Sequence, residues 1–180
     1  MRFSAIFSLL LILFWSQSEA QSKVQPFDKV SVNGNIELLL RPDDMHDVDA
    51  IVNKEDVTFA VQNGTLVISH ANDSKWSDPA RVTANFTRLT TVKASNGAVV
   101  TCECLMSADS LSLLANESAR IEMNIGCDAL TAYVANGSEM TLSGKVDIFE
   151  VQLSDKSVLN APTLEAKMVN IKSDTEASAT

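Results

Sequence analysis

Carboxylates are the most numerous groups in this sequence that could take part in chemistry, and the stretch Asp43–Asp49 holds four of them. As a calcium loop it lacks the central glycine and the closing bidentate glutamate of an EF-hand. We interpret it as a solvated turn, with a cation site as the alternative. Asp155 and Asp174 recur at one place in a repeat, but Asn136 stands there in another copy and cannot titrate. Polysaccharide hydrolases need paired carboxylates, so we predict no catalytic residue.

Three cysteines and two histidines are the other candidate ligands and nucleophiles. Cys102 and Cys104 are two residues apart, a spacing that rarely closes a disulfide, and Cys127 follows later. A zinc site needs four ligands, and neither His46 nor His70 lies at metal-site spacing from the cysteines. We expect free, buried thiols, with a bridge from Cys127 to Cys102 or Cys104 as the alternative. The sequence therefore predicts no metal site and no cofactor.

The first twenty residues have the pattern of a signal peptide. Arg2 precedes an apolar run, residues 6–15, which is shorter than the roughly 20 residues that span a bilayer. Ser18 and Ala20 place small residues at the −3 and −1 positions of a cleavage site. We predict cleavage after Ala20 and a single mature domain over residues 21–180. The protein should be exported, without a transmembrane segment, to the periplasm, the outer surface or the medium.

The formal net charge of the chain is −9. The predicted cleavage removes one basic and one acidic residue, so the mature chain keeps this charge. Such a balance repels nucleic acids and anionic membrane surfaces. We therefore expect no nucleic-acid partner.

The second half of the chain repeats itself about every twenty residues. Residues 111–123 read LSLLANESARIEM, and residues 130–142 read LTAYVANGSEMTL. One turn residue in each copy serves as an anchor, and the steps between anchors are 21, 19, 19 and 19 residues: the anchors are Gly97, Ser118, Gly137, Lys156 and Thr175. Apolar residues recur before and after each anchor. In the last copy these columns fail and contain Asn170, Lys172 and Ser178.

The repeat predicts stacked coils of β-strand. Within each copy the apolar residues alternate, which is the period of a strand. A meander of hairpins would need turn residues about every ten residues, whereas here they cluster once per copy. We predict an all-β, right-handed β-helix-like solenoid with coils of roughly 20 residues, in which like residues stack about 4.8 Å apart. Val134 should then be buried and Ser138 should reach solvent at a turn, where stacked asparagines could form a ladder.

An antiparallel N-terminal segment is expected to cover one end of the solenoid. Residues 27–40 alternate around Asn33-Gly34, and residues 57–68 alternate around Asn63-Gly64. Both patterns are typical of local antiparallel strands.

The order of these motifs resembles a known family. The stretches FDKVSVNGNIELLL at 27–40 and VQNGTLVI at 61–68, followed by the stacked coils, resemble the putative auto-transporter adhesin head (GIN) domain family. The resemblance covers essentially the whole mature chain and implies an exported bacterial β-helical domain without an established biochemical role. The Ser-Gly-Ala corner of the family is kept only as Asn96-Gly97-Ala98 and looser versions.

These observations favour an exported, non-enzymatic structural or adhesive module of the bacterial cell envelope that binds a protein or a glycan. The alternative is a periplasmic sensor or partner of a membrane system, and a small polysaccharide-active β-helix enzyme is less favoured. No pattern identifies the ligand-binding residues. We expect a monomer, because a charge such as Lys172 on the last coil discourages pairing of the exposed sheet edge.

Overall fold

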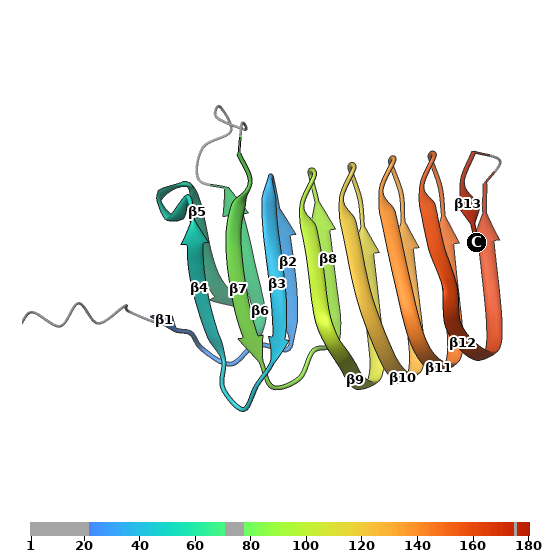
Figure 1. Ribbon diagram of the computed structural model, residues 1–180, viewed down its shortest axis with the longest axis horizontal. Helices are drawn as coiled ribbons and strands as arrows, with labels where there is room; N and C mark the ends of the chain where they lie inside the picture. The colour runs from blue at the N-terminus through green and yellow to red at the C-terminus, as the bar shows by residue number, and fades with distance from the viewer. Residues whose placement is uncertain (1–21, 71–77, 175) are drawn as a thin grey trace, which may run out of the picture.

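The strands of the computed structural model form a long solenoid (Figure 1). The structure describes residues 22–70, 78–174 and 176–180, so the expected signal peptide and Thr175 lie outside it. The strands are β1 (Ser22–Lys23), β2 (Lys29–Asn33), β3 (Ile36–Pro42), β4 (Asp47–Val52), β5 (Val57–Gln62), β6 (Thr65–His70), β7 (Ala80–Phe86), β8 (Thr91–Ser95), β9 (Val99–Ala115), β10 (Arg120–Val134), β11 (Glu139–Leu153), β12 (Val158–Ser173) and β13 (Ser178–Ala179). A short 3-10 turn, η1 (Lys54–Asp56), precedes β5.

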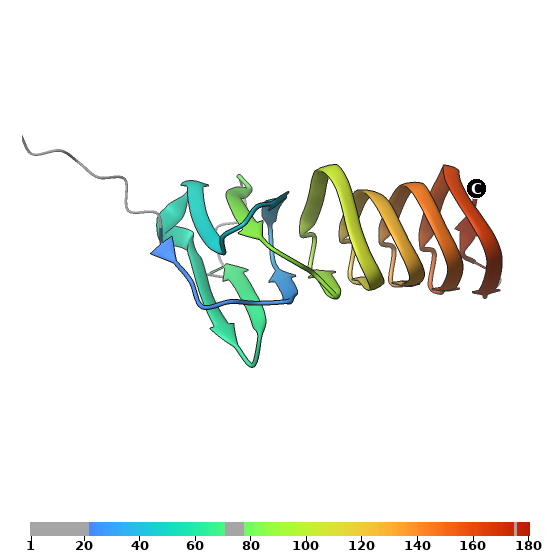
Figure 2. The same cartoon turned by 90° about the horizontal axis from the view of Figure 1, so that it is seen from below.

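The solenoid has two faces, because each long strand bends from one to the other. The first residues of β9 pair with β3, and its last residues pair with β8. We call face A the sheet of β5, β6, β2, β8 and the second halves of β9 to β12. Face B consists of β1, β4, β7, β3, the first halves of β9 to β12, and β13. The coils stack along the long axis, and buried apolar side chains fill the space between the faces (Figure 2).

Parallel pairing of consecutive coils confirms the predicted solenoid. Val134 pairs with Ala115 of the preceding coil and with Leu153 of the following coil, and all three are buried. The turn column is also confirmed in part. The Nδ2 group of Asn96 donates to Asn33 Oδ1 at 2.7 Å, and the Nδ2 group of Asn136 donates to Asn116 Oδ1 of the preceding coil at 2.6 Å.

Irregular steps of the repeat have a structural cause. The register of β9 against β10 jumps after Met123, which leaves two extra residues, Glu103 and Cys104, in β9. This bulge accounts for the one step of 21 residues. A second shift in β11 against β12 places one extra residue near Pro162.

The second shift corrects the prediction for the last coil. After it, Phe149 pairs with Val169, and Val151 pairs with Ile171, so the step is 20 residues. The apolar columns of Phe149 and Val151 therefore continue into the last coil, whereas Leu153 pairs with Ser173. The assignment of Asn170, Lys172 and Ser178 to the inward columns is wrong. Val169 and Ile171 are 51% and 50% exposed. Lys172 faces outward from β12, and the expected monomer stays a prediction.

The first coil is assembled out of chain order, which the sequence did not predict. β2 lies between β6 and β8, and β3 lies between β7 and β9, all in parallel pairs. The expected antiparallel pairing around Asn33-Gly34 is therefore wrong. The hairpin of β5 and β6 around Asn63-Gly64 is confirmed, and β1, β4 and β7 add antiparallel strands at the same end.

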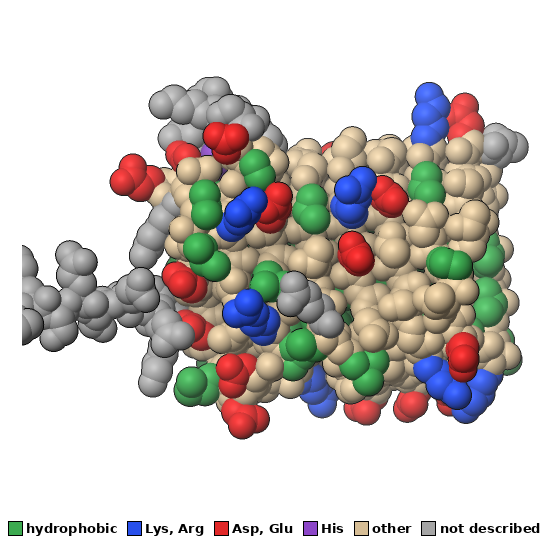
Figure 3. Space-filling view, in the orientation of Figure 1, with side chains coloured by type: hydrophobic (Ala, Val, Ile, Leu, Met, Phe, Trp, Pro, Cys, Tyr) green, Lys and Arg blue, Asp and Glu red, His purple; other side chains and the backbone are tan. Residues whose placement is uncertain are grey.

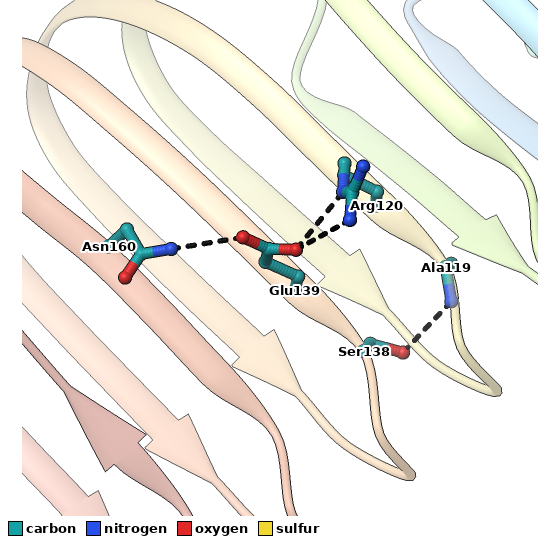
Figure 4. Close-up of polar contacts among 5 residues, drawn as sticks. All are labelled: Ala119, Arg120, Ser138, Glu139 and Asn160. Carbon is teal, nitrogen blue, oxygen red and sulfur yellow. Dashed lines mark hydrogen bonds and ion pairs between the residues drawn. The ribbon is translucent and has the colours of Figure 1, made fainter.

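Ser138 is buried, at 1% exposure, and does not reach solvent as predicted. Its hydroxyl accepts a hydrogen bond of 3.2 Å from the backbone N–H of Ala119 in the preceding coil (Figure 4). Ala98, Ala119 and Ser157 take the equivalent buried places in other coils. The position after the turn thus requires a small residue beneath the corner.

This contact gives a testable result for Ser138→Ala. The change should destabilise the fold by about 1–3 kcal/mol, because the N–H of Ala119 would be left buried without an acceptor. Thermal or urea unfolding measures the loss. Ser110→Ala, on an exposed strand position, is the matched control and should be nearly neutral; equal losses for the two variants would contradict this role for Ser138.

Candidate binding face

A row of five outward side chains crosses face A perpendicular to its strands. Successive strands pair at these positions, and the row reads Lys93, Leu114, Tyr133, Gln152 and Lys172. The inward neighbours of the first four residues are part of the core, and strand alternation therefore directs these four side chains to solvent. Lys172 continues the row through its pairing with Gln152. The row spans four strand spacings, about 19 Å at the usual separation of paired strands.

A second row runs beside the first and is mainly hydroxylic. Thr91, Ser112 and Thr131 pair in sequence on β8, β9 and β10, and Glu150 and Asn170 continue the row on β11 and β12. Hydroxyl and amide groups can both donate and accept hydrogen bonds. Glu150 is the only acidic residue in the two rows.

Two hollows on face A adjoin these rows. One, of about 640 Å³, is lined by residues that include Lys29, Lys93, Ser112 and Leu114. The other, of about 350 Å³, is lined on the next strands by residues that include Tyr133. Leu114, which lines the first hollow, pairs with Tyr133, which lines the second. Face A therefore offers a shallow, extended surface.

The lysines of face A differ from Lys145, Lys156 and Lys167, which are all ion-paired. Among the described residues, Lys29, Lys93 and Lys172 take part in no ion pair, although all three are exposed. On face B, Arg81 and Arg120 are ion-paired, and Figure 3 shows adjacent basic and acidic side chains, whereas Arg41 in β3 takes part in no ion pair with a described residue. There Arg120 binds Glu139 at 2.8 Å, and Glu139 also accepts from the Asn160 amide (Figure 4).

A third hollow lies where the long strands bend from face B to face A. Its lining includes the stacked aspartates Asp109, Asp128 and Asp147. Lys167 binds Asp147 at 2.7 Å and neutralises one end of this column. In the part of the chain that the structure describes, no group of His, Cys, Asp or Glu is arranged to hold a metal ion.

The acidic stretch Asp43–Asp49 is only partly a solvated turn. Asp43 and Asp44 are exposed, but Asp47 lies at 7% exposure in β4. His46 packs its ring edge-on against Phe27, with 4.7 Å between centroids, and its Nε2 lies 3.0 Å from the Thr87 hydroxyl. The interpretation as a solvated turn is therefore wrong for His46 and Asp47, because the chain enters a strand at this point.

Asp155 and Asp174 do stack, as the repeat predicted. The backbone N–H of Asp155 donates to Asp174 Oδ2 at 2.9 Å. This bond, together with bonds from the N–H groups of Glu176 and Ala177, lowers the pKa of Asp174. A carboxylate with a lowered pKa is a poor proton donor near neutral pH. The pair therefore fits a turn cap better than an acid catalyst.

None of Cys102, Cys104 and Cys127 is in a disulfide, so the alternative of a bridge from Cys127 is not formed. Cys102 and Cys127 are buried as expected, whereas Cys104 is exposed because it belongs to the bulge in β9. Burial raises the pKa of the Cys127 thiol to about 11, and the negative charge of Asp128 adds to the effect.

We expect one fast-reacting thiol in the native protein. At pH 8 a chromogenic disulfide reagent should modify Cys104 quickly and Cys127 slowly, because a thiol far below its pKa holds little thiolate. All three thiols should react after unfolding in guanidinium. In the Cys104→Ser variant the fast phase should vanish; a fast phase that persists would show that a buried thiol is accessible.

The rows on face A were not predicted from the sequence. The alignment of the repeat already placed Lys93, Leu114, Tyr133 and Gln152 four residues before their anchors. Lys172 was one position out of this column because the last step is 20 residues. The outward column was overlooked because it is chemically mixed, whereas an inward column is uniformly apolar.

Within residues 22–70, 78–174 and 176–180, no helix has the length and hydropathy to cross a membrane.

Comparison with known proteins identifies the fold and the family. A putative adhesin from Bacteroides fragilis matches with a TM-score of 0.78 and 17% identity, over 89% of this chain and 76% of that chain. Putative adhesins from Parabacteroides distasonis and Parabacteroides merdae give TM-scores of 0.70 and 0.66, each at 16% identity, over 89% of this chain and 79% and 78% of theirs. At such identities the likeness shows the fold alone.

No curated protein matches the sequence. The model of one family, described as putative auto-transporter adhesin, head GIN domain, matches residues 26–180. This range includes both N-terminal motifs and every coil, which confirms the resemblance inferred from the sequence. The chain belongs to the adhesin head GIN domain family.

Proposed function

We propose that this protein is a non-enzymatic adhesive module of the bacterial cell envelope, and that it binds a protein or glycan through face A. The observation that carries the proposal is the pair of hollows on neighbouring strands of face A, one lined by Leu114 and the other by its strand partner Tyr133. Ligand sites are typically concave, with apolar groups and a few polar ones that fix orientation. Membership of an adhesin family supports a binding role.

The proposal includes export through cleavage after Ala20, with the mature chain acting as a monomer. The small residues at Ser18 and Ala20 support this cleavage site. The intact mass of the protein recovered from the periplasm or the medium, together with size-exclusion chromatography, tests both points.

A pair of triple variants tests the use of face A. Lys29, Lys93 and Lys172 are changed to Gln in one variant, and Lys145, Lys156 and Lys167 in the other. Each lowers the net charge by three, from −9 to −12, but the second set lies at the corners in ion pairs. Binding of the purified proteins to glycan and protein arrays and to intact bacterial cells is measured.

We expect the face A variant to lose binding and the corner variant to keep it. Thermal melting of both variants must match that of the parent, so that a loss of binding reports on the surface and not on the fold. Equal binding by the two variants would show that face A is not the binding surface.

A further inference from the structure

We propose that the ligand of face A is an acidic polysaccharide, laid across the strands along the rows that contain Lys93 and Lys172. This inference rests on the proposed function, and it specifies the class of ligand. Lys93 and Lys172 lie at opposite ends of one row, about 19 Å apart by strand spacing. Two cations at this separation suit an extended chain that carries several negative charges.

The two rows differ in charge from the whole chain, and Asp174 lies outside the rows but lines the same hollow as Tyr133 and Lys172. The chain carries −9, yet the two rows and the neighbouring Lys29 hold three lysines and one glutamate, which gives 3 − 1 = +2. None of these lysines is ion-paired with a described residue. Exposed, unpaired ammonium groups attract carboxylate or sulfate groups without first breaking an internal pair.

The middle of the row suits a sugar ring. Tyr133 is 39% exposed and lies beside Leu114, so an aromatic ring and an aliphatic side chain form an apolar surface between the two lysines. The carbon face of a pyranose ring can pack against such a surface. Gln152, Ser112 and Thr131 surround it with groups that donate and accept hydrogen bonds, as sugar hydroxyls require.

An acidic peptide fits this surface less well. Extended peptides commonly bind by adding a strand to an unpaired sheet edge. The central strands of the rows, β9, β10 and β11, are paired on both sides, so their backbone groups are not free. A peptide could use only side-chain contacts here, whereas a polysaccharide needs no backbone partner.

Glu150 provides a test of the charge of the ligand. It is exposed in the hydroxylic row, two residues from Gln152 on the same strand. A negative charge at this place repels an anionic ligand and would leave a neutral one nearly unaffected. Glu150→Gln should therefore strengthen the binding of an acidic polysaccharide about two- to fivefold, within the range of exposed charge interactions.

Calorimetric titration of the mature protein tests the ligand class. The probes are oligogalacturonate, a cello-oligosaccharide of equal length as the neutral control, and poly-glutamate as the acidic peptide. We expect binding of oligogalacturonate only, weaker at higher salt. Lys93→Gln with Lys172→Gln should weaken it about tenfold or more, the loss of two charge-assisted contacts. The matched variant, Lys145→Gln with Lys156→Gln, should bind within about twofold of the parent.

Two further variants separate stacking from charge. Tyr133→Phe should keep the affinity, and Tyr133→Ala should lower it several-fold without changing the melting temperature, because an exposed side chain contributes little to the core. Preference for the neutral oligosaccharide or for poly-glutamate would overturn the acidic-polysaccharide assignment. In that case the proposed function would stand if the face A triple variant still lost binding to cells. If the face A triple variant bound as well as the parent in both assays, the ligand assignment and the proposed function would both be overturned.

Discussion

Val134→Asp should destabilise the protein by about 4 kcal/mol or more, which is a large part of the stability of an ordinary domain. Val134 is 1% exposed, and its strand neighbours in both adjacent coils, Ala115 and Leu153, are also buried. No polar partner replaces water around a carboxylate at this point in the column. Circular dichroism and urea unfolding should show a variant that is largely unfolded or melts far below the parent.

Gln152→Asp is the control for this variant. It introduces the same side chain one residue before Leu153, but on the exposed side of β11. The substitution should change the unfolding free energy by no more than about 0.5 kcal/mol. Similar melting temperatures for the two variants would contradict the assignment of inward and outward columns.

The columns could be predicted from the sequence because a solenoid gives each one a single environment. Ala115, Val134 and Leu153 all face the same interior layer, so all are apolar. The turn residues share a different constraint: Asn96, Glu117, Asn136 and Asp155, with φ between 52° and 56°, all adopt the left-handed conformation, in which Asn and Asp are enriched. Because the same constraint acts in every coil, a residue pattern that is weak in one copy becomes recognisable when the copies are aligned.

The order of the first coils could not be predicted, because alternation does not specify a pairing partner. Val30 and Val32 must face the core whether β2 pairs with β3 or with β6 and β8, and the observed pairing is the second. The motif of residues 27–40 therefore suggested a local hairpin that the chain does not form. When paired parallel strands are far apart in the sequence, no local sequence pattern identifies which strands pair.

The last coil and the binding face were missed for related reasons. One extra residue near Pro162 moves every following side chain by one position, and a shift of one residue exchanges the two faces of a strand. Lys172 was consequently placed in the core column, although it completes the outward row that begins at Lys93. The outward row is not constrained by packing in the core, so its composition varies from coil to coil.

Gly144→Ala is expected to have the second large effect on stability. Gly144 has a φ of +110° in β11, where it pairs between Ile125 and Leu164. An added Cβ would collide with the carbonyl oxygen of Ile125, and it would lie 2.7 Å from Asn124 Oδ1 and 2.9 Å from the Ile125 nitrogen. The two Ile125 atoms are backbone atoms of the preceding coil and are held by the hydrogen bonds between β10 and β11, so they cannot move away cheaply.

Two costs add at this position. A non-glycine residue at this φ is strained by about 1–3 kcal/mol, and overpacking against a fixed neighbour costs about 1–3 kcal/mol more. Gly144→Ala should therefore lose about 2–6 kcal/mol in urea unfolding.

Gly126→Ala is the matched control, because its φ lies outside the left-handed region and the nearest atom to an added Cβ is Leu105 Cδ1 at 3.5 Å, an ordinary contact. That variant should gain about 0.4–1 kcal/mol through the lower entropy of its unfolded chain. If the two glycine-to-alanine substitutions change stability in opposite directions, the backbone geometry at Gly144, and not the loss of a glycine as such, limits which residues fit there. A neutral Gly144→Ala would contradict this, because it would mean that adjacent coils move apart more easily than their hydrogen bonds imply.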